Sequence, residues 1–342
     1  ICPETRKNEI VSFVKSGLKD LSISRSTFDW GVPLPFDEGH VAYVWADALL
    51  AYLTGIGYGD EGERAGEFER RWPMQYHFVG KDITRFHCVI WPAMLMAAGM
   101  PITHTVFGHG FLLTKGEKMS KSKGNALKPA DLCKVFGVDA YRYYFMSDVQ
   151  FGADGSISLE RMVQVYNADL ANTWGNLCSR VFNMTKKYFD GAVPEVPAEV
   201  KAKENPLRAI SDELYAEYDA ALAAADFTRA AAAVQKLASR VNLYVEESAP
   251  WNLAKSEETA GELAEVIYNA LEAIRIIALY MAPLMPNTSA EVFRRLSLGS
   301  VTDVTDIEAA TAWGQLPAGN AVEIGDPLFP RLDTDAIDLS ME

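Results

Sequence analysis

A short basic segment, Lys118-Met119-Ser120-Lys121-Ser122, has the clearest chemical potential in the sequence. It carries two ammonium groups and two hydroxyl groups, and Lys123 and Gly124 follow it. Lysine side chains act as point charges toward phosphates, and they stabilise negative charge that develops on a departing phosphate. The segment therefore predicts a loop that closes over a phosphorylated ligand. An arbitrary loop of Lys and Ser would more often be a solvated basic turn.

A second group of polar residues lies in the C-terminal half. Asn176 and Arg180 are four residues apart, so a helix would place both on one face. Trp251 follows a helical pattern and adds an aromatic ring. Asn and Arg can read the edges of unpaired bases, and an aromatic ring can stack on one. The three residues indicate a site for single-stranded RNA, and the alternative is a polar surface beside a packed tryptophan.

The elements that must position these residues change in character along the chain. In the first 150 residues, strand patterns at 40–45, 74–79 and 104–108 alternate with helical patterns at 9–17, 46–53 and 83–98. This alternation predicts a parallel α/β sheet, and ligands bind where such strands end, here at Gly80 and Gly108.

After about residue 156, apolar residues recur at three- and four-residue steps. The spacing predicts a long helix over 159–184 and further helices over 206–223, 227–248 and 258–281. The second half is therefore expected to be a helical bundle. Residues 299–342 are rich in Gly, Asp, Thr and Pro, and we expect them to run over the surface.

Composition narrows the class of protein. The 342 residues include 32 Lys or Arg and 46 Asp or Glu, a net charge of −14, which argues against nonspecific nucleic-acid binding. No run approaches the roughly 20 apolar residues of a membrane span. The four cysteines are scattered, as is typical of reduced thiols in a cytoplasmic protein. We therefore expect a cytoplasmic location, no membrane partner and no metal site within the chain.

Further motifs occur in a fixed order: YVWADA at 43–48, GKDI at 80–83, FH at 86–87, WPA at 91–93 and GHGF at 108–111. The segment at 118–122 matches KMSKS, the second signature of class I aminoacyl-tRNA synthetases. Together these motifs make the chain similar to methionyl-tRNA synthetases over nearly its whole length. The resemblance implies an α/β fold, with the second half of a Rossmann-type catalytic domain at 1–114, the KMSKS loop and connecting region at 115–156, and an all-α anticodon-binding bundle with a surface tail at 157–342.

The resemblance implies a methionine–tRNA ligase that uses ATP with Mg²⁺. L-methionine would form methionyl-adenylate and pyrophosphate, and the aminoacyl group would pass to methionine tRNA with its CAU anticodon. Lys118 and Lys121 would be catalytic, because they would stabilise the triphosphate as pyrophosphate forms. The ATP-binding residues implied are Gly80, Asp82, His109, Gly110, Leu112, Lys118, Met119, Ser120, Lys121 and Ser122.

The resemblance also implies a methionine pocket and an anticodon site. The pocket residues would be Arg25, near the substrate carboxylate, and Trp45, Leu49, Tyr52, Phe86, His87 and Trp91. An aromatic wall suits a polarizable thioether, and His87 would organise the polar group that senses sulfur. Asn176, Arg180 and Trp251 would read the anticodon. Each residue also has a plainer role open to it: Trp45 and Trp91 as core aromatics, Asp82 as a helix cap and Arg25 in a surface ion pair.

Two departures from the family bear on activity. The His-x-Gly-His motif of the first half of the catalytic fold and the metal-binding insertion are both missing from this sequence. We therefore expect the N-terminal catalytic half to be a partner from outside this chain. The alternatives are another class I synthetase, a tRNA-binding module without catalysis, and a purely structural helical protein.

Overall fold

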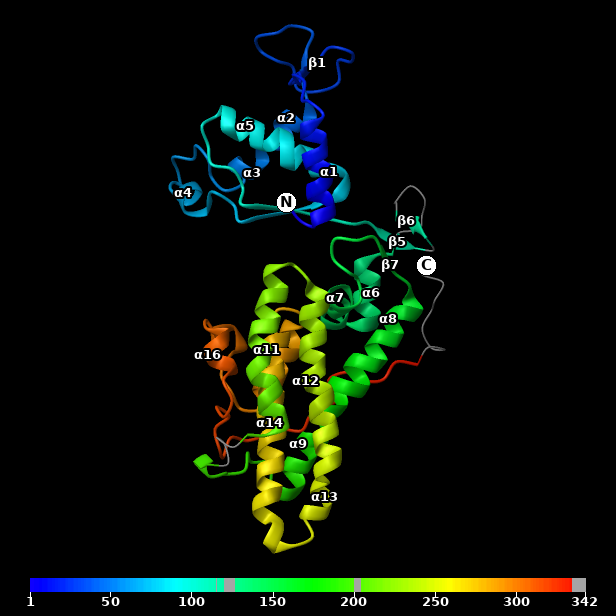
Figure 1. Ribbon diagram of the computed structural model, residues 1–342, viewed down its shortest axis with the longest axis vertical. Coiled ribbons are helices and arrows are strands. Elements are labelled where there is room, and N and C mark those ends of the chain that lie inside the picture. Colours follow the sequence, from blue (N-terminus) through cyan, green and yellow to red (C-terminus); the bar gives the residue numbers. More distant parts are fainter. Residues whose placement is uncertain (115, 120–126, 200–203, 334–342) are drawn as a thin grey trace. The chain divides into compact units, whose positions relative to one another are not determined.

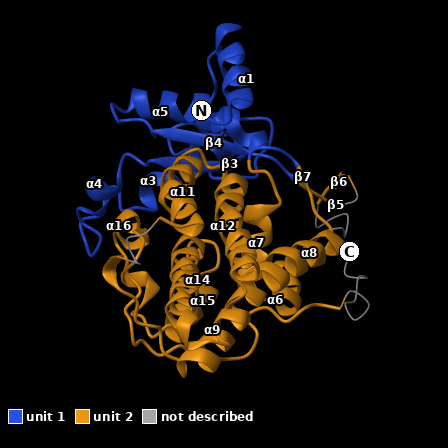
Figure 2. Ribbon diagram, turned by 60° about the horizontal axis from the view of Figure 1, so that its bottom comes forward, with its two compact units in different colours: residues 1–111, 152–154 blue, residues 112–151, 155–342 orange. Residues whose placement is uncertain are grey.

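The computed structural model describes residues 1–114, 116–119, 127–199 and 204–333. Figure 2 shows its two compact units: unit 1 is Ile1–Phe111 with Gly152–Asp154, and unit 2 is Leu112–Phe151 with Gly155–Glu342. The short segment 152–154 thus belongs to unit 1 although unit 2 flanks it on both sides. We expected three functional segments, divided at residues 114 and 156, and that division stays a prediction.

A pair of parallel strands lies at the centre of unit 1. β3 (Tyr76–Gly80) and β4 (Thr105–His109) pair in register from Tyr76 with Thr105 to Gly80 with His109. Cys2 forms a parallel bridge to β4 at Phe107. Parallel strands require a crossover connection, and this one contains helical segments between residues 81 and 97. The strands predicted at 74–79 and 104–108 are confirmed.

Short helical segments accompany this strand pair in unit 1, and Figure 2 labels several of them with the two strands. They are α1 (Glu4–Lys15), α2 (Val44–Ala48), α3 (Ala51–Thr54), α4 (Glu67–Arg71), the 3₁₀-helix η1 (Lys81–Ile83), the π-helix η2 (Phe86–Ile90) and α5 (Trp91–Ala97). The strand predicted at 40–45 is wrong in extent and in pairing. Only β2 (Val41–Ala42) forms there, and it pairs antiparallel with β1 (Ser24–Arg25). The segment buries Val41 alone, so it lacks the apolar face that a central strand needs.

Unit 2 begins with a small sheet and two helices. β5 (Leu112–Thr114) lies between β6 (Glu117–Lys118), which is antiparallel to it, and β7 (Gly155–Ser156), which is parallel. In the sequence, helices α6 (Pro129–Phe136) and α7 (Val138–Ser147) lie between β6 and β7.

The rest of unit 2 is a helical bundle, as predicted. The helix expected over 159–184 is a continuous series of α8 (Leu159–Val165), the π-helix η4 (Tyr166–Gly175) and α9 (Asn176–Phe189). The other elements are α11 (Pro206–Ala223), α12 (Phe227–Ser248), α13 (Pro250–Leu253), η5 (Glu257–Thr259), α14 (Ala260–Met281), α15 (Pro286–Arg295), η6 (Val301–Asp303) and α16 (Ile307–Thr311). Helices α11, α12 and α14 lie side by side in Figure 1. Helix α14 is buried on every side from Val266 to Met281, so it forms the axis of the core.

A buried ion pair on α14 anchors part of the segment that follows residue 299. Glu272 and Arg275 lie 2.7 Å apart, and both are nearly inaccessible to solvent. Glu272 also accepts hydrogen bonds from the backbone N–H groups of Gly314, Gln315 and Leu316. Buried charges need such partners. The described residues 299–333 are mostly exposed, while the buried side chains of Leu316, Val322 and Phe329 join them to the hydrophobic core of the bundle. The surface tail stays a prediction for the segment as a whole. No helix in the described part of the chain is long and apolar enough to cross a membrane.

Candidate functional site

Six of the seven residues predicted for the methionine pocket come together in unit 1. The ring of Trp45 stacks on Phe86 with centroids 4.0 Å apart and meets His87 edge-on at 6.1 Å. The ring of Tyr52 lies 6.1 Å from that of Trp91. Leu49 and Trp91 are buried in a small core, with Trp45 and Tyr52 packed against it. The result is an aromatic wall that continues into the core.

Two short stretches of chain build this wall. Trp45 lies on α2, Leu49 ends that helix and Tyr52 lies on α3, so one face of two consecutive helical turns supplies all three. Phe86 and His87 lie on the π-helix η2, and Trp91 begins α5 directly after it. Single π-turns are rare and occur frequently at functional sites.

A hydrogen bond crosses the aromatic cluster from Tyr52 to His87. The backbone carbonyl of Ile83 lies 2.9 Å from His87 Nδ1, and a carbonyl can only accept, so Nδ1 carries the proton. His87 Nε2 is then the acceptor for the Tyr52 hydroxyl at 2.8 Å. Burial lowers the pKa of His87, which favours this neutral form.

His77 is a member of the cluster that the sequence reasoning missed. Its ring lies 4.4 Å from that of Tyr52 and 5.7 Å from that of His87. Burial, together with His87, lowers the pKa of His77 to about 4. The alternation of β3 could have identified it, because His77 and Val79 occupy the inward positions of that strand.

Arg25 lies outside this group of contacts. It is on β1, where its guanidinium lies 3.7 Å from the centroid of the Tyr43 ring and donates to the carbonyls of Ser22 and Ser24. Its role toward a substrate carboxylate stays a prediction.

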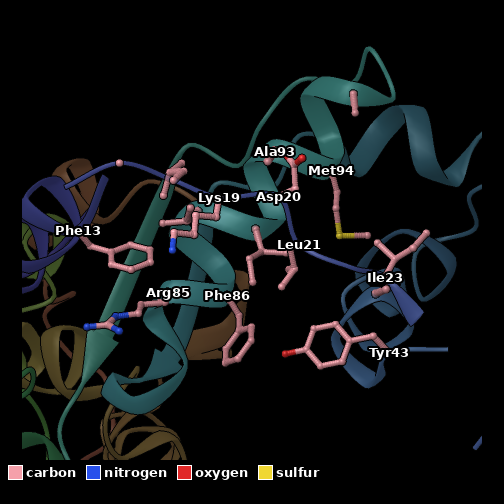
Figure 3. Close-up of a pocket in the computed structure, with 16 residues that line it drawn as sticks. Phe13, Lys19, Asp20, Leu21, Ile23, Tyr43, Arg85, Phe86, Ala93 and Met94 are labelled. Atoms are coloured by element: carbon pink, nitrogen blue, oxygen red, sulfur yellow. The ribbon is translucent and has the colours of Figure 1, made fainter. Parts of the chain in front are cut away.

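A pocket of about 790 Å³ adjoins the aromatic cluster through Phe86, which belongs to both. Residues of α1, the 17–23 segment, η2 and α5 line it, and most are apolar. Figure 3 shows the rings of Phe86 and Tyr43 directed toward each other, with Leu21 and Met94 nearby. Arg85 stacks on Phe13, with its guanidinium carbon 4.6 Å from the centroid of the ring.

The ends of β3 and β4 bring the predicted nucleotide residues of unit 1 together. Gly80 and His109 are register partners, and Asp82 follows in η1. A Cβ atom on Gly80 would lie 2.7 Å from Asp82 Oδ1, and one on Gly110 would lie 2.1 Å from the carbonyl oxygen of Ala153. Only glycine allows such close approach. His109 Nδ1 donates to the Gly110 carbonyl at 2.9 Å.

Lys81 and Asp154 also lie at these strand ends. Lys81 belongs to the GKDI motif but was given no role, and nothing in the sequence pointed to Asp154. Lys81 Nζ is 2.7 Å from each carboxylate oxygen of Asp154, which is 73 residues away in the chain. The backbone N–H of Phe111 donates to Asp154 Oδ1 at 2.9 Å. The hydrogen bond from Lys81, followed by that from Phe111, holds the pKa of Asp154 below its usual value.

The predicted catalytic loop is described only in part. Lys118 is exposed on β6 opposite Leu113, and the backbone N–H of Met119 donates to the carbonyl of Leu112 on β5. Ser120, Lys121 and Ser122 lie outside the described residues.

The predicted RNA-binding residues are accessible in unit 2. Asn176 is exposed at the start of α9, and the side chain of Arg180 is 30% exposed one turn later. Arg180 donates to Glu246 Oε1 at 2.6 Å, in the last turn of α12. Trp251 follows on α13 and is 40% exposed. A hollow of about 370 Å³ beside Asn176 is also lined by Asn172, Ser179 and Arg331.

Comparisons with known proteins agree with both parts of this arrangement. The family model described as tRNA synthetases class I (M) matches residues 2–182, and the model of the anticodon binding domain of methionyl tRNA ligase matches residues 193–339.

The similar relatives and solved structures are also methionyl-tRNA synthetases. A methionine–tRNA ligase of Caldanaerobacter subterraneus subsp. tengcongensis is 45% identical over 100% of this chain and 53% of its own length. A methionine–tRNA ligase of Streptomyces coelicolor is 47% identical over 97% of this chain and 62% of its own length. The structure of Mycobacterium tuberculosis methionyl-tRNA synthetase in complex with methionyl-adenylate matches 96% of this chain and 64% of its own, with 41% identity and a TM-score of 0.87. The chain therefore spans between about half and two thirds of the length of these relatives.

Proposed function

Because the chain belongs to the methionyl-tRNA synthetases of class I, we propose that it acts in the ATP-dependent ligation of L-methionine to methionine tRNA. The observation that carries the proposal is the hydrogen bond from Tyr52 to His87 within an aromatic wall. A thioether is flexible, polarizable and a weak acceptor, so aromatic rings and one polar group suit it. Trp45, Leu49, Tyr52, Phe86, His87 and Trp91 are the proposed wall, and Arg25 the proposed partner of the substrate carboxylate.

The proposed activation step joins methionine to the α-phosphate of ATP. A carboxylate oxygen of methionine forms a bond to the α-phosphorus, the bond from that phosphorus to the bridging oxygen breaks, and pyrophosphate leaves with the electron pair. Enzymes catalyse such transfers mainly by positioning and by electrostatic stabilisation. We assign stabilisation of the departing pyrophosphate to Lys118 and Lys121.

The nucleotide is proposed to bind where β3 and β4 end. Asp82 is suited to accept hydrogen bonds from the ribose hydroxyls. Gly80 lets the chain approach the Asp82 carboxylate closely, and Gly110 lets it approach the backbone at 153–154. His109 and Leu112 are proposed beside the adenine, and Met119, Ser120 and Ser122 in the loop over the phosphates. The described residues contain no cluster of three or more His, Cys, Asp or Glu side chains that could hold a metal, so Mg²⁺ is proposed to arrive with ATP.

The helical bundle is proposed to read the CAU anticodon. The exposed ring of Trp251 is available for stacking on a base, and Asn176 and Arg180 present hydrogen-bonding groups from one face of α9. Nucleic-acid binding needs Arg180 to leave Glu246, which exposed ion pairs allow at a cost of about 1 kcal/mol or less. The cytoplasm, where tRNA is charged, is the proposed place of action.

Activity is proposed to require the N-terminal catalytic half as a partner. Among the described residues, β3 has a strand partner only in β4, and its outward side chains Tyr76 and Phe78 are 43% and 50% exposed. Trp30 and Phe36, also in unit 1, are 87% and 79% exposed. Apolar patches of this kind mark sites that another protein segment covers.

The test is methionine-dependent exchange between ATP and pyrophosphate, first with this chain and then with the catalytic half of a relative added. We expect exchange only after addition, and none when leucine or isoleucine replaces methionine. Exchange with leucine or isoleucine would identify another class I specificity. No exchange under either condition, with binding to a CAU anticodon hairpin retained, would replace the proposal by a tRNA-binding module without catalysis.

A further inference from the structure

An ion pair at the carboxyl ends of β3 and β4 has a consequence for the proposed nucleotide site. Lys81 lies between Gly80 and Asp82, which are both proposed to bind ATP. Its position in the sequence therefore suggests an ammonium that binds a phosphate of ATP. The structure gives this ammonium another partner, because Nζ lies 2.7 Å from both carboxylate oxygens of Asp154. The side chains of the pair are 23% and 35% exposed, so solvent reaches the pair in part.

Asp154 links the lysine that follows β3 to the backbone that follows β4. Its Oδ1 accepts the backbone N–H of Phe111 at 2.9 Å, and Lys81 Nζ also lies 4.7 Å from the centroid of the Phe111 ring. Two groups from distant parts of the sequence, the Lys81 ammonium and the Phe111 N–H, therefore meet at one carboxylate.

The contact beside this carboxylate is unusually close. A Cβ atom on Gly110 would lie 2.1 Å from the carbonyl oxygen of Ala153 and 2.5 Å from the backbone nitrogen of Asp154. The turn at Gly110 therefore packs directly on the backbone at 153–154. Both hydrogen bonds to Asp154 hold its pKa below the usual value, so the carboxylate stays charged near neutral pH.

We propose that Lys81 and Asp154 are a positioning pair, which fixes the turn at His109, Gly110 and Phe111 for the nucleotide, and that Lys81 does not contact a phosphate. This inference rests on the proposed ATP-dependent function. In this proposal the charge of Lys81 holds the turn in place and takes no part in the reaction.

Three variants of the chain, assayed with the added catalytic half, test the pair. Lys81→Met removes the ammonium, Asp154→Asn removes the negative charge but keeps an acceptor for Phe111, and Asp154→Ala removes both interactions. We expect Lys81→Met and Asp154→Asn to raise the KM for ATP by a similar factor of about three to ten, as for a partly sheltered ion pair. Asp154→Ala should raise it further. The KM for methionine and kcat should stay within about twofold of the parent values, since the pair supports only nucleotide binding.

The control is Glu67→Gln, which breaks the Arg64–Glu67 pair elsewhere in unit 1, where the atoms lie 2.9 Å apart. It should leave all these parameters unchanged. A phosphate contact by Lys81 predicts a different pattern. Lys81→Met would then lower kcat by about 10²–10³, whereas Asp154→Asn would free the lysine and leave kcat equal or higher. Such opposite responses would overturn the proposal.

A second measurement needs no activity. Hydrogen exchange of the Phe111 amide in this chain without ATP should be faster in Asp154→Ala than in Asp154→Asn. Equal exchange in the parent and in Asp154→Ala would show that the pair does not hold the turn. If the parent has no exchange activity with the added half, the proposed function fails, yet the Phe111 amide still tests the positioning role.

Discussion

The hydrogen bond between Tyr52 and His87 places a polar contact inside an apolar wall. Other contacts hold both side chains in place, because His87 Nδ1 donates to the carbonyl of Ile83 and the Tyr52 ring packs on His77. The atoms that could respond to a thioether are therefore fixed before a ligand binds. Preorganisation of this kind reduces the entropy lost on binding.

Replacing Tyr52 by Phe tests the pocket at the scale of one atom. The variant keeps the ring contacts but leaves His87 Nε2 without its donor, so we expect the KM for methionine to rise about tenfold, with kcat less affected. Discrimination between methionine and norleucine, which lacks sulfur, should also fall. Tyr58→Phe is the control, because Tyr58 is exposed and packs on Phe68 in the same unit. Unchanged discrimination in Tyr52→Phe would remove the hydroxyl from the recognition of sulfur.

The ion pair between Arg180 and Glu246 predicts that a mutation of Glu246 increases the affinity for the anticodon. Glu246→Gln removes a negative charge close to the proposed anticodon site and frees the guanidinium. We expect a CAU hairpin to bind about two- to fivefold more tightly, in line with the small energy of exposed pairs. The measurement is a titration of a fluorescent hairpin at a fixed salt concentration.

The matched control for Glu246 is the next residue in the chain. Glu247 pairs with Arg240 at 2.9 Å and is about as exposed, so Glu247→Gln changes the net charge equally. Equal gains in both variants would attribute the effect to overall charge and not to Arg180. Trp251→Ala should weaken binding at unchanged stability, and a loss of stability alone would favour a structural role for the ring.

At the scale of the element, helix α14 shows how one buried pair fixes a long segment. Glu272 bonds to Arg275 and to three consecutive backbone N–H groups at 314–316, while Arg275 donates to the carbonyls of Ala310 and Ala312. The segment after α16 is thereby held against the bundle.

Removing Glu272 should therefore destabilise unit 2 strongly. Glu272→Ala leaves Arg275 buried without its charge partner, and the loss of one partner of a buried pair costs about 3–5 kcal/mol in the free energy of unfolding. Urea unfolding of the chain, followed by far-UV circular dichroism, measures this change. Glu291→Ala breaks pairs with Arg294 and Arg295 in which the carboxylate is 34% exposed, so it should cost clearly less than Glu272→Ala. Similar losses in the two variants would contradict the role given to burial.

At the scale of the whole molecule, the two units have different titratable groups. All five histidines lie in unit 1, at positions 40, 77, 87, 104 and 109. Burial lowers the pKa of His87, and burial with His87 lowers that of His77 to about 4. In unit 2, hydrogen bonds from Arg294 and Arg295 lower the pKa of Glu291 to about 2, and burial raises that of Asp169.

These shifts predict that unit 1 is the first to lose stability in acid. Between pH 6.5 and about 4, unfolded unit 1 binds protons that its folded form does not bind, so its free energy of unfolding decreases as the pH is lowered through this range. The histidine at position 77 alone accounts for up to about 3 kcal/mol. Unit 2 has no histidine, and its contribution from Glu291 is lost only from about pH 4.5 to 2, while Asp169 acts in the opposite direction.

Amide hydrogen exchange at pH 7, 5.5 and 4.5, corrected for its intrinsic pH dependence, resolves the two units. Amides of β3 should lose protection before those of α14, and His77→Phe should flatten the change in β3. Simultaneous loss in both elements would show that the units unfold together and that the histidines do not set the acid response.

The fold was predictable where the pattern of residues is local. Apolar spacing gave the bounds of α11 and α12 to the residue, and alternation located β3 and β4, because helix and strand periods are recorded directly in the chain. The π-helices η2 and η4 were not predicted, since apolar steps of three and four residues do not by themselves distinguish a short π-helical stretch from an α-helix. The anchoring of residues 314–316 was not predicted, because it depends on Glu272, which is remote in the sequence.

The sequence by itself determined the family, through the ordered motifs from residue 43 to residue 122, and it named most of the aromatic wall. The types and order of motif residues can be recognised without knowing what surrounds them in space, so the sequence was sufficient to identify the family. Only the tertiary structure revealed the link from Lys81 to Asp154 across 73 residues. Such contacts arise when strand ends and loops meet in space, and the hydrogen bonds that create them leave no periodic trace in the chain.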